Sequence, residues 1–141
     1  MWATKNGLEL AIKGGGHSSN GASSTEGGVI IDLSRLRGVT IDTEKDLAYC
    51  QGGALWSDLD TAAAEKGFAA VSGTVNHTGI GGLTLGGGYG YLTGQYGLVI
   101  DNLVEATVVV ADGRIVKASE KENPDLFWGI RGLSPHCPRL I

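Results

Sequence analysis

The sequence predicts an α+β domain, and three observations lead to this fold class. Short β-rich runs outnumber the helical ones and occur among them in mixed order. Residues 56–66 carry apolar side chains at helical spacing. Two further β-rich runs, residues 104–110 and 114–118, meet at Asp112-Gly113, which is a strong local signal for a hairpin. A chain of 141 residues is long enough for one domain with a buried core.

The N-terminal part of the chain is predicted to hold one partial helix and four short strands. Residues 4–10 are typical of the last turns of a helix, and residues 10–12 form a short buried strand that leads into a glycine run. Glycine-containing turns and a charged segment delimit the next three β-rich runs, which are residues 29–33, 39–41 and 47–50.

The ends of two helices are also predicted. The helix over residues 56–66 stops at Gly67, a residue type that is common just after helix C-termini. A second helix begins at Asn123-Pro124-Asp125, which supplies a capping side chain, a proline for the first helical position and an acidic residue for the first turn. Its buried face is predicted to consist of Leu126, Phe127, Trp128 and Ile130.

The composition is that of a globular protein, with 42% hydrophobic and 18% charged residues. The net charge of −4 and the scattered basic residues argue against a nucleic-acid partner. No apolar run approaches the ~18 residues of a membrane span and the N-terminus lacks signal-peptide order, so we expect no membrane partner and a cytoplasmic location for the chain as written. Cys50 and Cys137 lack partners at metal-binding spacing, so we expect two unlinked thiols, Cys50 as a small buried hydrophobe, and no metal site.

Glycine is concentrated in two stretches of this sequence, residues 13–19 and residues 79–90. The chain contains 24 glycines, well above the usual ~7% of residues, and they follow no Gly-X-Y period. Glycine is favoured where the backbone adopts positive φ or comes close to a ligand. Two such loops therefore predict a site that holds a phosphorylated cofactor between them.

Two common phosphate-binding motifs are excluded. The pattern Gly-x-Gly-x-x-Gly fails at every start because Ser19, Thr84, Tyr91 or Thr93 replaces the third glycine, and the chain contains no Gly-Lys dipeptide. Consecutive backbone N–H groups that form anion-binding concavities remain as the predicted way of holding a pyrophosphate. His17 follows three glycines directly, which places its side chain at the predicted cofactor rather than in a core.

A series of motifs in a fixed order resembles a known family. Taken together, they resemble the PCMH-type FAD-binding domain of FAD-linked oxidases of the vanillyl-alcohol oxidase type, close to berberine-bridge-like and 6-hydroxynicotine-oxidase-like enzymes. The resemblance covers residues 2–132. The motifs are Gly15-Gly16-His17-Ser18, Gly53-Ala54-Leu55-Trp56, Gly73-Thr74, the stretch 79–90, Asp101-Asn102, Ala111-Asp112-Gly113 and Asn123-Pro124-Asp125-Leu126-Phe127-Trp128.

This resemblance implies FAD as the cofactor and a set of residues that hold it. His17 is implied to bond covalently to the 8α-methyl group of the flavin. Residues 14–19 are implied to cradle the pyrophosphate, and residues 73–88 to line the pyrophosphate and the flavin ring. The implied cofactor-binding residues are Gly14, Gly15, Gly16, His17, Ser18, Ser19, Gly73, Thr74, Gly79, Gly81, Gly82, Gly86 and Gly87.

Other residues near these motifs have simpler interpretations. Relatives with two covalent flavin bonds carry a cysteine where this chain has Val75, so a second, cysteinyl bond is not expected. We interpret His77 as a polar loop residue near the cofactor and Asp101 as a side chain that accepts hydrogen bonds from the backbone. Three tyrosines either stack on the flavin or pack beneath the loops, and they are Tyr89, Tyr91 and Tyr96.

The expected organisation is a partial FAD-binding domain over residues 1–132 and an irregular tail outside the family pattern over residues 133–141. Enzymes of this family add a substrate domain and further strands, so we expect a chain truncated at both ends. The expected function is the FAD-binding portion of a flavin-dependent oxidoreductase, in which substrate transfers a hydride to FAD and dioxygen reoxidises the flavin. Two alternatives are a non-catalytic FAD-binding fragment, or a remnant that lacks the substrate domain and does not fold alone, and a binding module for another nucleotide. A small-molecule substrate is expected only for a full-length form, whose secretion stays open.

Overall fold

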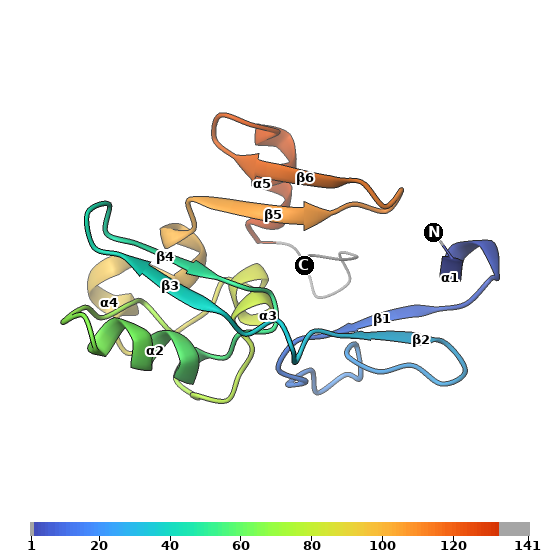
Figure 1. The fold of residues 1–141 in the computed structure, drawn as a ribbon, viewed down its shortest axis with the longest axis horizontal. Coiled ribbons are helices and arrows are strands. Elements are labelled where there is room, and N and C mark those ends of the chain that lie inside the picture. Colours follow the sequence, from blue (N-terminus) through green and yellow to red (C-terminus); the bar gives the residue numbers. More distant parts are fainter. Residues whose placement is uncertain (1, 133–141) are drawn as a thin grey trace.

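The computed structural model describes residues 2–132 and has the expected α+β architecture. Its strands form three two-stranded sheets, of which one is parallel and two are antiparallel. Figure 1 shows the parallel pair extending away from the rest of the molecule, while each antiparallel pair packs against a helix. The predicted tail over residues 133–141, including His136 and Cys137, lies outside the described residues.

The parallel pair consists of β1 (Leu10–Lys13) and β2 (Val29–Asp32), with Leu10 opposite Val29. It follows α1 (Trp2–Lys5), which is shorter than predicted. The prediction of helix up to residue 10 was wrong because Gly7 adopts a φ of 65° and the chain turns there before the strand begins. The link between β1 and β2 contains the first glycine stretch, so the strand delivers this stretch at the end of the pair.

The first antiparallel pair joins β3 (Val39–Asp42) to β4 (Leu47–Cys50), and α2 (Trp56–Ala64) packs on it. The helix is confirmed, and Gly67 lies just past its end with a φ of 78°. Trp56, Leu59 and Val99 form the buried core between these elements. Cys50 is only partly buried against this core, and burial raises the pKa of its thiol to about 11.

Three short helical segments follow α2, and the first of them contains the middle of the second glycine-rich region. They are α3 (Ile80–Leu85), α4 (Thr93–Tyr96) and the 3₁₀ helix η1 (Val99–Asn102). Contacts join α3 to η1, and Ile80 and Leu83 pack against the core around Trp56.

The second antiparallel pair joins β5 (Glu105–Val109) to β6 (Ile115–Ser119), and α5 (Pro124–Ile130) packs on β6. The hairpin at Asp112-Gly113 is confirmed, with Gly113 at a φ of 86°. A second core of Val108, Ala118, Phe127 and Ile130 fills the space between strands and helix.

Two expectations for α5 were wrong. Trp128 is 81% exposed, because the buried side of this short helix is occupied by Phe127 and Ile130, which leaves Trp128 facing outward. Asn123 does not cap the helix with its side chain. Its backbone is left-handed and its side-chain amide donates instead to the carbonyl of Lys117, 2.7 Å away.

Among the described residues, no helix is both long and apolar enough to cross a membrane.

Candidate functional site

The two predicted glycine loops meet at Gly15 and Gly79. We call residues 13–19 the first loop and residues 73–90 the second loop. A Cβ atom built on Gly15 would lie 2.3 Å from the backbone nitrogen of Gly79, and one built on Gly79 would lie 2.5 Å from that of Gly15. Backbone therefore touches backbone at this point, and no side chain larger than hydrogen fits on either residue.

A third segment, not foreseen as part of the site, approaches the same place. The carbonyl oxygen of Gly52 lies 3.5 Å from the position that a Cβ of Gly14 would occupy, and 3.5 Å from that of a Cβ of Gly81. The loop after β4 thus lies between the two predicted loops. The dipeptide Gly52-Gly53 was a sequence signal for this position, since paired glycines mark close backbone approach.

The first loop is held to the protein by few hydrogen bonds. Within residues 2–132, none of the backbone N–H groups of residues 14–19 donates a hydrogen bond to another protein group. Gly16 has a φ of 70° and is exposed, as is His17. The hydroxyl of Ser18 contacts Asn20 and accepts from the N–H of Ala22, so it closes a local turn. The loop offers a run of unpaired donors of the kind that bind anions.

His17 lies against His77 from the second loop. Nε2 of His17 is 2.5 Å from Nδ1 of His77, and the two ring centroids are 4.6 Å apart. His77 is therefore more than a nearby polar loop residue, because it is a direct hydrogen-bond partner of the predicted flavin anchor. The contact leaves Nδ1 of His17 without a hydrogen-bond partner among the described residues.

The backbone next to His77 is fixed by the first turn of α2. The N–H groups of Trp56 and Ser57 donate to the carbonyls of Thr78 (3.1 Å) and Asn76 (2.8 Å). Ile80 donates in turn to the carbonyl of Ala54, 2.9 Å away. These bonds use N–H groups that a helix start leaves without partners inside the helix.

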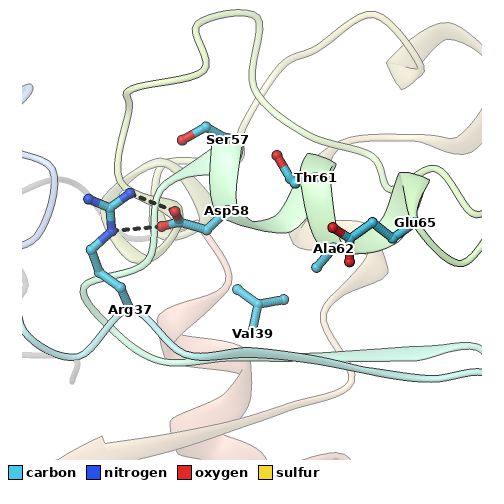
Figure 2. A pocket seen from close by; sticks show the side chains of 7 residues that line it. All are labelled: Arg37, Val39, Ser57, Asp58, Thr61, Ala62 and Glu65. Carbon is cyan, nitrogen blue, oxygen red and sulfur yellow. Dashed lines mark hydrogen bonds and ion pairs between the residues drawn. The ribbon is translucent and has the colours of Figure 1, made fainter.

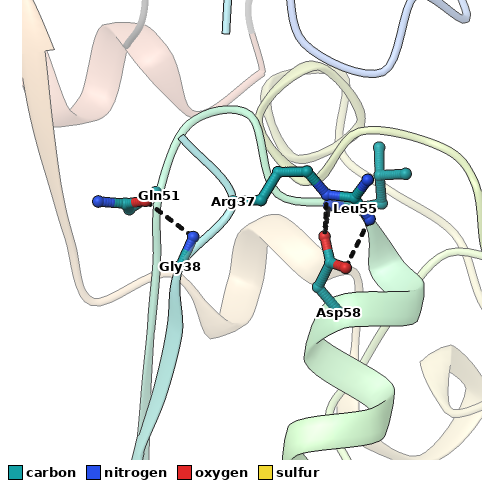
Figure 3. A network of polar contacts seen from close by, with 5 residues as sticks. All are labelled: Arg37, Gly38, Gln51, Leu55 and Asp58. Atoms are coloured by element: carbon teal, nitrogen blue, oxygen red, sulfur yellow. Dashed lines mark hydrogen bonds and ion pairs between the residues drawn. The ribbon is translucent and has the colours of Figure 1, made fainter. Parts of the chain in front are cut away.

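The start of α2 is itself held by an ion pair. Arg37 donates through Nε and Nη2 to both carboxylate oxygens of Asp58, at 2.9 and 2.6 Å, and Asp58 also accepts from the N–H of Leu55 at 2.8 Å (Figure 3). The hydrogen bonds from Arg37 lower the pKa of Asp58. A carboxylate in the first helical turn also matches the positive end of the helix dipole. The network positions the helix that anchors the second loop.

Several predicted site glycines of the second loop are packed against protein. Gly73 is buried, and a Cβ there would lie 2.6 Å from Leu83 and 2.8 Å from Nε1 of Trp56. Gly86 and Gly87 donate to the carbonyls of Leu83 and Thr84, and Gly87 accepts from Ile100. In contrast, Thr74 is exposed and Gly82 has no atom within 4 Å of its Cβ position. Beside the first loop, the accessible part of the second loop is that of Gly81 and Gly82, next to the buried Gly79.

Two expectations remain, one for Asp101 and one for the three tyrosines. Asp101 accepts a hydrogen bond from the N–H of Leu98 at 2.8 Å, as predicted. The alternative in which the tyrosines pack beneath the loops was wrong, since Tyr89, Tyr91 and Tyr96 are 68%, 87% and 55% exposed.

A surface pocket lies between α2 and the start of β3, and none of its lining belongs to the glycine loops. Figure 2 shows the ion pair of Arg37 and Asp58 at one end of it. No lining residue comes from either loop, so the pocket is separate from the candidate cofactor site. Its lining consists of Arg37, Val39, Ser57, Asp58, Thr61, Ala62 and Glu65.

Comparisons with known proteins identify the family of the chain. A family model described as the FAD binding domain matches residues 1–119. The chain is 49% identical over 136 residues to the FAD-linked oxidoreductase pgmH of Aspergillus terreus, covering 96% of this chain and 27% of that protein. It is 42% identical to the (R)-6-hydroxynicotine oxidase of Paenarthrobacter nicotinovorans, covering 96% of this chain and 30% of the oxidase. The chain thus spans less than a third of the length of these relatives.

Solved structures agree at the level of the fold. The crystal structure of 6-hydroxy-D-nicotine oxidase from Arthrobacter nicotinovorans matches with a TM-score of 0.91 at 43% identity, covering 93% of this chain and 29% of that one. Glucooligosaccharide oxidase from Acremonium strictum, whose FAD is described as 6-S-cysteinyl and 8α-N1-histidyl, matches with a TM-score of 0.78 at 42% identity over 92% of this chain and 28% of that one. Because the family model covers most of the sequence, this chain belongs to the FAD binding domain family of the FAD-linked oxidoreductases.

Proposed function

We propose that this chain binds FAD between its two glycine loops and that His17 is the covalent attachment point of the flavin. The observation that carries the proposal is the backbone contact of Gly15 with Gly79, which brings the two loops together two residues from His17. The proposed cofactor contacts are those of residues 14–19 in the first loop and of Thr74, Gly79, Gly81 and Gly82 in the second.

The residues present fit a pyrophosphate. Side chains are excluded at Gly15 and Gly79, so a ligand at this crossing meets backbone. The N–H groups of residues 14–19, and those of Gly81 and Gly82, donate to no other group within residues 2–132. Such groups supply hydrogen bonds to phosphate oxygens. Gly73 and Gly87 are buried, and Gly86 is hydrogen-bonded to Leu83 within the second loop. We propose that these three glycines affect the cofactor only through the shape of the loop.

The proposed attachment uses Nδ1 of His17, because Nε2 is engaged by His77. Glucooligosaccharide oxidase is described as carrying both a histidyl and a cysteinyl bond to its FAD. This chain has Val75 where the resemblance places the cysteine, so we propose a single covalent bond.

The redox role follows from the cofactor. When bound, FAD accepts a hydride equivalent from a substrate and passes the electrons to dioxygen, as in flavin oxidases. The chain contributes binding and orientation of the flavin. A small-molecule substrate, of the kind that the names of the relatives describe as 6-hydroxynicotine or oligosaccharides, is proposed for a protein that also has a substrate-binding part.

The test is the visible absorption spectrum of the purified chain before and after acid precipitation. We expect yellow colour that remains with the protein pellet, and its loss from the pellet in His17→Ala. The matched control is His136→Ala, which removes a histidine outside both loops and should leave the pellet coloured. A colourless wild-type chain after incubation with FAD would contradict the proposal, as would acid-stable flavin in His17→Ala.

A FAD-binding chain without turnover is the second candidate. The observation in its favour is that neither loop contains an aspartate or glutamate, and that Asp101 is engaged by the backbone of Leu98. A carboxylate that could act as general base near the flavin is therefore missing from the loops themselves. Anaerobic addition of 6-hydroxynicotine or oligosaccharides distinguishes the two candidates. Bleaching of the flavin would indicate catalysis, and an unchanged spectrum would favour binding alone.

A further inference from the structure

We propose that His77 is a positioning residue and proton acceptor for His17 during attachment of the flavin, an inference that rests on the proposed function. The observation behind it is the contact of Nε2 of His17 with Nδ1 of His77 at 2.5 Å. The proposal assigns the hydrogen to Nε2 of His17, which then donates it to Nδ1 of His77. The lone pair of His17 is then on Nδ1, the nitrogen that the contact leaves free.

Both histidines are carried by backbone segments whose separation is fixed. His17 lies two residues after Gly15, and His77 lies two residues before Gly79. Gly15 contacts Gly79 and His17 contacts His77, so the two segments run in opposite directions at this point. The planes of the two rings are inclined by 36°.

The segment with His77 is the more firmly held of the two. The carbonyls on either side of His77, those of Asn76 and Thr78, accept hydrogen bonds from Ser57 and Trp56 at the start of α2. In the first loop, the carbonyl of Lys13 at its start accepts from Leu33, and beyond it only the local bond from Gly21 to the carbonyl of Ser18 is present within residues 2–132. The backbone that carries His77 is therefore held in place. From this position the ring of His77 orients the ring of His17, as a hydrogen-bond partner does for other functional histidines.

The chemistry of attachment gives the pair a second task. A C–N bond forms between Nδ1 of His17 and the 8α carbon, while one C–H bond of the 8α-methyl group and the Nε2–H bond of His17 break. The imidazole proton passes to Nδ1 of His77 and the methyl proton to water. The two electrons that remain on the flavin reduce dioxygen, which with two protons gives hydrogen peroxide. Removal of the imidazole proton keeps His17 neutral as its Nδ1 forms the bond.

The experiment measures the rate at which chain prepared from riboflavin-starved cells acquires acid-stable flavin after addition of FAD. His77→Ala removes both tasks, whereas His77→Asn keeps a hydrogen-bond acceptor that takes no proton. We expect the attachment rate to fall by about 10²-fold or more in His77→Ala and by at least about tenfold in His77→Asn, in line with the usual size of general-base effects. Added imidazole should restore part of the rate of His77→Ala. Asn76→Ala, an exposed neighbour that keeps its backbone carbonyl, is the matched control and should attach flavin at the wild-type rate.

Two further readouts separate the outcomes. Non-covalent FAD affinity should be unchanged in His77→Ala, because the proposed contact is to His17 and not to the cofactor. Nitrogen-15 spectra of the imidazole rings should show His17 protonated at Nε2 in the wild-type chain. Wild-type attachment rates in His77→Ala, or protonation of His17 at Nδ1, would overturn the inference. A rate for His77→Asn equal to that of the wild type would overturn proton acceptance. A wild-type chain without acid-stable flavin would instead overturn the proposed function.

Discussion

The two glycine loops use the same residue for different purposes. In the first loop, glycine leaves the backbone exposed, with unpaired N–H groups among the described residues and one positive φ at Gly16. In the second, several glycines permit close packing, such as Gly73 beside Trp56 and Gly88 beside Val99. High glycine content therefore indicates a ligand site only where the glycine backbone is also accessible and its donors are unpaired.

The comparison predicts its largest effect on stability at Gly90. A Cβ there would lie 1.6 Å from the carbonyl oxygen of Ser72, a backbone atom that has no rotamer to change. We expect Gly90→Ala to lower the free energy of unfolding by at least about 3 kcal/mol, at the upper end of overpacking effects. Thermal unfolding followed by circular dichroism measures the change.

The matched control for Gly90 is Gly94→Ala in α4. Its Cβ position has no atom within 4 Å, and Gly94 is helical, so alanine should be neutral or stabilising by up to about 1 kcal/mol. Equal melting temperatures for Gly90→Ala and the wild type would contradict the packing role of the second loop.

The second prediction concerns the point where the loops cross. Gly15→Ala places a Cβ 2.3 Å from the backbone nitrogen of Gly79 and should push the exposed first loop away from the anchored second loop. We expect acid-stable flavin to be lost, with a cost in unfolding free energy of about 1 kcal/mol, smaller than at Gly90 because the first loop makes few bonds. Gly14→Ala, with only an ordinary contact to Gly52, is the control and should keep the chain as stable as the wild type. A Gly15→Ala chain that still holds flavin in the pellet would show that the loops need not touch.

At Gly82 the two functions of glycine predict opposite effects of an alanine substitution, namely higher stability of the fold and lower affinity for FAD. It lies in α3 with open space around its Cβ position, so Gly82→Ala should stabilise the fold by about 0.5–1 kcal/mol. If its backbone contacts FAD, the same substitution should weaken non-covalent FAD binding by about tenfold, which corresponds to ~1.4 kcal/mol. Melting temperature and a flavin-fluorescence titration on one preparation measure both effects. Stabilisation without loss of affinity would remove Gly82 from the cofactor site.

Local signals were sufficient to predict most of the elements. The hairpin of β5 and β6 follows from Asp112-Gly113, and the end of α2 follows from Gly67, because both depend on residues adjacent in the sequence. The exposure of Trp128 was missed because a helix as short as α5 buries only one narrow face, and the sequence does not specify which apolar residues occupy it.

The residues of the site were found more readily than their arrangement. Glycine runs and His17 are visible as patterns, but the pairing of His17 with His77 depends on a contact between segments 60 residues apart. No local pattern encodes that contact, since it results from how α2 anchors the second loop. The parallel pairing of β1 with β2 is likewise a long-range feature that short strand signals do not specify.

The smallest expected effect concerns the ion pair that holds the start of α2. Because Arg37 lowers the pKa of Asp58 in the folded chain, the ionised carboxylate stabilises the fold above its unfolded pKa of about 3.9. This contribution is lost as the pH falls from there through the lower folded pKa. Asp58→Asn should therefore give a slightly lower melting temperature at pH 7 and a shallower decline below pH ~4. Melting temperatures across the acid range measure both quantities.

Melting temperatures across the acid range also distinguish the first loop from the second. Asp32 at the end of β2 also has a lowered pKa, of about 2, through the N–H and hydroxyl of Ser34 and through Lys13, but it is exposed and borders the first loop. Asp32→Asn should change the acid limb without changing flavin attachment, since no bond links Asp32 to the second loop within residues 2–132. Asp58→Asn should change both, because loosening the start of α2 also loosens the carbonyls around His77. Equal effects of the two variants on attachment would mean that α2 does not set the position of the second loop.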